Sequence, residues 1–198
     1  MENALDPVQE QLLIERVQQH QDSAAFRLLY NQYFPKVYAY VGYRVPITED
    51  TEDLVAETFL RVLKNLEAYE WRGEGSFAAW LFAIAHNLVS NYYRSHAIRQ
   101  EQVDLSALDR LAEDPIRPLD VVSQRQRVVA LQQLIRTLSP RRQEVITLKF
   151  FGGLRNKEIA TLLGLDERTV ASHLSRGLRD LYELYEQRYS MTQEGAFQ

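Results

Sequence analysis

The sequence contains no cysteine, which excludes disulfide bridges, thiol nucleophiles and thiolate zinc sites. Its four histidines are scattered without metal-ligand spacing, so we expect neither a metal nor another cofactor. No apolar run approaches the roughly 20 residues that a membrane span needs. The acidic stretch 1–10 also lacks an apolar signal core. We therefore expect a cytoplasmic protein with no membrane insertion.

Glycine and proline are also scarce, with eight and six among 198 residues, and few apolar runs alternate as strands require. This composition predicts an all-α protein. Apolar residues at helical spacing predict two helices over 8–20 and 24–44. They also predict one helix that starts at Thr48 and another that runs from Ser76 to residue 96. The pattern resumes at Ser123 and restarts at Ser139-Pro140, a cap followed by proline at the first helical position. Between them, 97–122 is acidic and aperiodic, and we interpret it as a linker with a short helix near 104–112.

A helix-turn-helix pattern spans residues 155–185. Gly164 follows the first short helix, where a left-handed residue commonly ends a helix, and Asp166 is placed to cap the second. An apolar stripe predicts the core face of that second helix: Val170, Leu174, Leu178 and Leu181. The opposite face offers donors for phosphates and base edges in a major groove: Arg168, Thr169, Ser172, His173, Arg176 and Arg179. A plain helical hairpin with a solvated face would have the same turn and capping residues, so the motif alone leaves that alternative open.

The charge is divided unevenly along the chain. The net charge of −4 comprises −5 for residues 1–95, −3 for 96–123 and +4 for 124–187. This asymmetry predicts a DNA-facing C-terminal domain, and an N-terminal domain that meets a protein or something basic. The acidic cluster within 49–57 suits the start of a helix. No nucleophile–base pair, metal cluster or phosphate-cradling glycine loop is apparent, so we expect no enzyme and no catalytic residue.

The helix predicted over 76–96 carries amide, aromatic and cationic groups on its outer face. Rings stack on bases and arginine meets phosphate, so this combination suits single-stranded nucleic acid. Most aromatic residues on helices nevertheless belong to cores, and the feature is weak alone. The outer residues are His86, Asn87, Asn91, Tyr92, Tyr93 and Arg94.

Two regions together resemble one family. EDLVAETFLRVLKNL with GSFAAWLFAIAHNLVSNYYR is similar to the second region of bacterial sigma factors of the extracytoplasmic-function group, the compact members of the sigma-70 family. LSPRRQEVITLKFFGGLRNKEIATLLGLDERTVASHLSRGLRDL is similar to their fourth region. The resemblance implies two small helical domains, 1–96 and 123–187, joined by the acidic linker 97–122 and followed by a tail, 188–198.

The resemblance also implies a function: binding core RNA polymerase, directing it to promoters and assisting DNA melting. The polymerase partners would be the β′ clamp helices and the β flap. The clamp surface would comprise Asp53, Leu54, Glu57, Thr58, Arg61 and Val62. The melting surface for the minus-ten element would comprise Arg72, Ser76, Asn87, Asn91, Tyr92, Tyr93 and Arg94. The minus-thirty-five element would meet Lys157, Arg168, Thr169, Ser172, His173, Arg176 and Arg179.

The family is often held inactive by an anti-sigma protein, and the sequence does not say whether one exists here. The chain departs from the usual pattern at Ser95-His96-Ala97, Ala171 and Ser175, where family members often carry more basic residues. Fewer cations predict weaker intrinsic affinity for DNA. A conventional helix-turn-helix regulator with an N-terminal sensing or dimerisation domain is the alternative. It predicts symmetric half-sites and DNA binding without polymerase.

Overall fold

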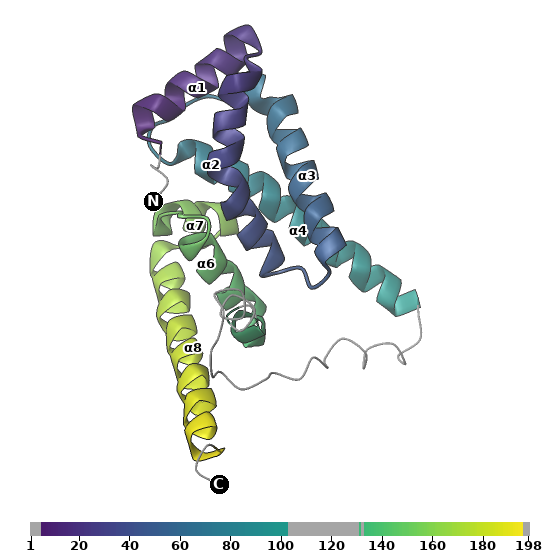
Figure 1. Ribbon diagram of the computed structural model, residues 1–198, viewed down its shortest axis with the longest axis vertical. Coiled ribbons are helices and arrows are strands. Elements are labelled where there is room, and N and C mark those ends of the chain that lie inside the picture. The colour runs from purple at the N-terminus through teal and green to yellow at the C-terminus, as the bar shows by residue number, and fades with distance from the viewer. Residues whose placement is uncertain (1–4, 103–130, 132, 196–198) are drawn as a thin grey trace.

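The computed structural model describes residues 5–102, 131 and 133–195, with the backbone alone for 97–102 and 188–195. Every regular element of these residues is helical, as predicted (Figure 1). The elements in chain order are α1 (Pro7–His20), α2 (Ser23–Gly42), α3 (Thr48–Asn65), the short 3-10 helix η1 (Leu66–Ala68), α4 (Ser76–Gln102), α6 (Pro140–Phe150), α7 (Asn156–Leu163) and α8 (Glu167–Gly195).

Helices α1 to α4 form an N-terminal domain around a shared apolar core. Asp6 caps α1 and Asp22 caps α2, each accepting two backbone N–H bonds that the helix start leaves free. Helix α2 continues through Pro35. The fully buried side chains of this core include Ile14, Leu29, Val37, Tyr40, Leu66, Phe77, Leu81 and Phe82.

Helix α1 also supports the segment that leads into α4. The side-chain amide of Gln18 donates to the carbonyls of Leu66 at 2.9 Å and Tyr69 at 2.7 Å. These carbonyls lie at η1 and just after it, so the first helix fixes the start of the following loop, 70–75.

Helices α6, α7 and α8 form the C-terminal domain, and the predicted helix-turn-helix is confirmed at its turn. Gly164 ends α7 with φ 64°, in the left-handed region that favours glycine. Oδ1 of Asp166 accepts the backbone N–H of Thr169 at 2.8 Å, which caps α8 as predicted. Val170 is fully buried between the helices.

Several predictions about single positions were wrong. Leu178 is 45% exposed, and the buried position is Gly177, because a 3.6-residue repeat places position 177 beside α6. A Cβ on Gly177 would lie 2.6 Å from Cδ1 of Ile146, so the glycine permits close helix packing. Leu63 of α3 fits the helical spacing of apolar residues and is nevertheless 49% exposed. Ser139 precedes α6 without making a side-chain capping bond.

Helix α4 ends later than the sequence predicts. Helix α4 continues to Gln102, past the expected start of the linker at residue 97. The short helix expected near 104–112 lies outside the described residues, as does most of the helix expected from Ser123, although residues 133–137 are helical.

The two domains pack against one another, with α6 beside α2 and α7 beside α4 (Figure 1). Tyr43 stacks on Phe151 with ring centroids 4.2 Å apart. The Arg136 guanidinium donates to the carbonyls of Gly42 and Val45, at 3.3 and 3.1 Å. The described structure is therefore a closed arrangement of the two domains.

Candidate nucleic-acid interface

The outer face of the helix-turn-helix presents four exposed cations: Lys157, Arg168, Arg176 and Arg179. Arg179 lies 3.9 Å from Glu183, a loose surface pair that leaves its guanidinium available. The predicted contacts Thr169, Ser172 and His173 are half-buried. The hydroxyl of Thr169 donates to Oδ2 of Asp166 at 2.6 Å, so this side chain helps to cap α8.

His173 lies beside cations that the sequence interpretation did not select. Burial and the positive charges of Arg141, Arg142 and Arg176 lower the pKa of His173, so the ring is predominantly neutral at pH 7. Arg141 and Arg142 come from the first turn of α6, and Arg142 also pairs with Asp180 on α8. The adjacent arginines just after Ser139-Pro140 were the available sequence signal, and they extend the basic surface of α8 onto α6.

The loop before α4 is held by polar contacts and two glycines in positive φ. Gly73 has φ 102° and Gly75 φ 78°, which other residues rarely adopt. Ser76 is the first residue of α4, as the sequence predicts, and its side chain bonds to the loop. Its Oγ lies 2.8 Å from the hydroxyl of Tyr69 and accepts the backbone N–H of Arg72 at 3.1 Å. Ser76 therefore closes the loop, while the Arg72 side chain is exposed beside Glu70.

Helix α4 divides the predicted melting residues into two groups. Asn87, Asn91, Tyr93 and Arg94 are exposed, whereas Tyr92 is half-buried. The Tyr92 hydroxyl donates to Oδ2 of Asp50 at 2.8 Å, and burial together with this carboxylate raises the pKa of Tyr92. Tyr92 therefore joins α4 to α3, and the exposed amides, ring and cation remain available to a nucleic acid.

The predicted polymerase surface on α3 is partly in the core. Thr58 and Val62 are 0% and 1% exposed, so the prediction that they contact a partner was wrong. Both face the N-terminal core, because the apolar stripe of α3 passes through them. Leu54 is half-buried and Asp53 is exposed, while Glu57 pairs with Arg61 at 2.7 Å on the outer side. Leu60 and Leu63 are half-exposed on the same helix, an apolar addition that the sequence interpretation missed.

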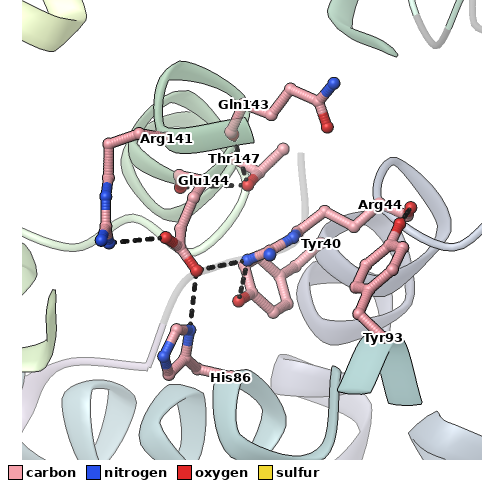
Figure 2. A network of polar contacts seen from close by, with 8 residues as sticks. All are labelled: Tyr40, Arg44, His86, Tyr93, Arg141, Gln143, Glu144 and Thr147. Carbon is pink, nitrogen blue, oxygen red and sulfur yellow. Dashed lines mark hydrogen bonds and ion pairs between the residues drawn. The ribbon is translucent and has the colours of Figure 1, made fainter. Parts of the chain in front are cut away.

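A polar cluster at the domain interface was also missed. Figure 2 shows the Glu144 carboxylate of α6 between Arg44, His86 and Arg141. Oε1 lies 2.7 Å from Arg44 Nη1 and 2.9 Å from His86 Nδ1, and Oε2 lies 3.0 Å from Arg141 Nη1. Burial raises the pKa of Glu144, but the contact with His86 and the charge of Arg44 outweigh it and lower the pKa to about 2.

Among the described residues, no group of three or more His, Asp or Glu is arranged to hold a metal ion. None of the helices described is long and apolar enough to cross a membrane.

Comparisons with known proteins match both domains. The model of sigma-70 region 2 matches residues 29–98, and that of sigma-70 region 4 matches residues 129–181. The chain is 36% identical over 177 residues to the ECF RNA polymerase sigma factor BldN of Streptomyces coelicolor, covering 87% of this chain and 64% of that protein. It is 30% identical over 174 residues to the ECF RNA polymerase sigma-E factor of Escherichia coli, covering 84% of this chain and 89% of that protein.

Solved structures share the fold. CnrH, in complex with the cytosolic domain of CnrY, has a TM-score of 0.65 at 21% identity, covering 90% of this chain and 98% of that one. The sigma factor RpoE of Bartonella quintana, in complex with the anti-sigma factor NepR, has a TM-score of 0.63 at 23% identity, covering 81% and 96%. The two regional matches, in this order, and the identity to sigma-E over most of its length lead to one conclusion: the chain belongs to the extracytoplasmic-function sigma factors of the sigma-70 family.

Proposed function

We propose that this chain acts in the cytoplasm, binds core RNA polymerase, directs it to specific promoters and assists strand separation. The observation that carries the proposal is that one chain presents two exposed faces of different chemistry, one on α4 and one on α8. The exposed face of α4, with the glycine loop before it, suits single-stranded DNA. The cationic face of α8 suits a major groove. A conventional regulator has no use for the first of these surfaces, and the family match covers both domains.

The outer side of α3 is the proposed docking surface for the β′ clamp helices. It combines two acids, the exposed Asp53 and the half-buried Glu57, with the half-exposed apolar residues Leu60 and Leu63. Acidic groups steer a basic partner and apolar groups supply buried area, so the two kinds together form a protein interface. Thr58 and Val62 act only from the core, by holding α3 in place.

The promoter contacts follow from exposure. The separated minus-ten strand is proposed to contact Arg72 in the loop and four residues of α4: Asn87, Asn91, Tyr93 and Arg94. Ser76 is proposed to shape that loop. Near the start of α8, Arg168 and Ser172 are proposed to meet base edges of the minus-thirty-five element. The DNA phosphates are proposed to contact Lys157, Arg176 and Arg179. The C-terminal domain is proposed to bind the β flap of the polymerase.

An anti-sigma partner also belongs to the proposal. Support comes from the solved RpoE relative, whose structure contains the anti-sigma factor NepR.

The test is co-purification with core polymerase. The double variant Asp53→Arg with Glu57→Arg is expected to lose binding to core polymerase, because both charges face outward and neither belongs to the core stripe. Glu67→Arg with Glu186→Arg makes the same charge change at exposed positions on η1 and α8, and should bind normally. Failure of the unaltered chain to bind polymerase, together with symmetric binding to duplex DNA, would favour the conventional regulator.

A further inference from the structure

The cluster around Glu144 joins two domains through one carboxylate. Arg44 lies just beyond α2 and His86 lies on α4, so both belong to the N-terminal domain, whereas Glu144 belongs to α6. The side chains of Arg44 and Glu144 are only 10% and 8% exposed. Arg44 and Glu144 are separated by 100 positions in the sequence. The contact therefore exists only while the domains are packed together.

His86 is incompletely satisfied by this contact. Its Nδ1 is buried and makes no well-aligned hydrogen bond within the described residues, although Oε1 of Glu144 lies 2.9 Å away. A cavity of about 670 Å³ lies beside the cluster, lined by Ser90 and Tyr93 of α4 and by Pro140 and Gln143 of α6, among others. The centres of permanent interfaces are packed as densely as protein interiors, whereas this cleft is partly open to solvent. Both features indicate a contact that is not optimised for permanence.

The N-terminal half of the cluster continues the surface proposed for the melted strand. The Tyr93 hydroxyl donates to the backbone carbonyl of Arg44, which places this residue directly beside the exposed ring. His86 precedes Asn87 on α4. Arginine and histidine are donors that bind phosphate as readily as carboxylate. With Glu144 removed, the Arg44 guanidinium and the His86 ring would both face the edge of this surface without a carboxylate partner.

We propose that Arg44 and His86 form a binding site for a backbone phosphate of single-stranded promoter DNA, which Glu144 occupies until the two domains separate. The proposal rests on the proposed function and adds two DNA contacts to it. The carboxylate is the intramolecular stand-in for the phosphate, and exchange of one for the other couples DNA capture to domain separation.

The rest of the interface also obstructs the strand in the closed arrangement. The Arg155 guanidinium at the start of α7 donates to the carbonyl of Glu74 in the glycine loop at 2.8 Å. Oε1 of Glu158 would lie 2.8 Å from a Cβ placed on Gly75, so α7 rests directly on that loop. A base cannot enter the loop while α7 is there, and the domains must part before the strand binds.

The test measures binding of the full chain to a labelled single-stranded DNA of random sequence, twelve nucleotides long, by fluorescence anisotropy at several salt concentrations. Glu144→Gln should tighten binding about tenfold, the effect of one charge-assisted hydrogen bond. Glu186→Gln, at an exposed position of α8, makes the same charge change and should alter binding less than about twofold.

Adding Arg44→Gln to Glu144→Gln should abolish the gain and reduce the salt slope by about 0.7, the value for one phosphate of a single strand. Arg44→Lys in the same background should retain most of the gain, which separates loss of charge from loss of folding. An unchanged affinity in Glu144→Gln, or a double variant that keeps the gain, would overturn the proposal.

A cross-link provides a second measurement. The chain has no native cysteine, so Tyr43→Cys with Phe151→Cys, introduced with Glu144→Gln and joined by a short bismaleimide, would hold the domains closed. The locked protein should lose the tighter binding that its unlinked form shows. Equal binding by both forms would refute occlusion. None of these measurements uses polymerase, so failure here is distinct from a failure of the co-purification test.

Discussion

Replacing Glu144 by glutamine should destabilise the closed arrangement in a pH-dependent way. The carboxylate is 8% exposed, and His86 and Arg44 lower its pKa from 4.5 to about 2 despite burial. Because the pKa is lower in the closed state, the ionised form stabilises that state fully above pH 4.5. The stabilisation is lost as the pH falls from 4.5 to about 2.

The magnitude follows from the same values. Each pH unit corresponds to about 1.4 kcal/mol, so the fall from 4.5 to about 2 represents about 3 kcal/mol. Glutamine cannot ionise, and the variant should lack this contribution at every pH. The free energy of unfolding should therefore differ by about 3 kcal/mol between the two proteins at pH 7, and the difference should vanish towards pH 2.

Urea unfolding of both proteins between pH 7 and pH 2.5, followed by circular dichroism, measures the difference in the free energy of unfolding. The contributions of the other carboxylates cancel, because both chains share them. Carbon-13 NMR of the labelled glutamate side chains measures the pKa of Glu144 directly. A titration of Glu144 near 4.5, or a stability difference equal at both ends of the pH range, would refute the reasoning.

Three other predictions concern α4 and α8. Asn87→Ala should weaken the open complex more than the closed complex, as permanganate footprints report, because base capture acts only on separated strands; an effect on duplex binding alone would contradict this role. Arg168→Ala should relax base preference at particular positions of the minus-thirty-five element by about 1–3 kcal/mol. Arg176→Ala should weaken binding to all promoter variants equally and lower the salt slope of binding by about one. The test is holoenzyme binding to a library randomised in that element, at two salt concentrations. A uniform loss for Arg168→Ala, with a base-specific loss for Arg176→Ala, would reverse the two roles. Gly177→Val should lower the free energy of unfolding by about 1–3 kcal/mol through overpacking against Ile146, and an unchanged urea midpoint would mean that α6 shifts freely.

Local signals predicted the helical elements well. Gly164 and Asp166 mark helix ends through backbone bonds and conformations that depend on adjacent residues only. A few neighbouring residues determine each of these helix ends, and the structure confirms each one. The two-domain family resemblance likewise depended on contiguous motifs, and the regional matches confirm it.

Positions along a helix face were less predictable. Leu178 and Gly177 are adjacent, and the choice between them depends on the exact phase of α8 against α6. The apolar stripe alone favoured the leucine, whereas close packing against Ile146 selects the glycine. Thr58 and Val62 were misassigned because the family motif includes residues that hold a helix as well as residues that touch a partner.

The Glu144 cluster could not be predicted at all. Its partners are distant in sequence, and no periodicity or spacing relates Glu144 to Arg44 or His86. Only the packing of α6 beside α2 brings them together. Interfaces between domains are set by long-range contacts, which a single sequence does not reveal.

The side-chain amide of Gln18 bonds the carbonyls of Leu66 and Tyr69, so α1 acts as a brace for the segment that follows α3. A shorter translation product that begins after α1 would retain both regions that match the family, residues 29–98 and 129–181. It would nevertheless leave two carbonyls without their donor and expose the core that Ile14 covers. Loss of α1 would therefore remove the support at the start of the loop 70–75, even though both matched regions remain.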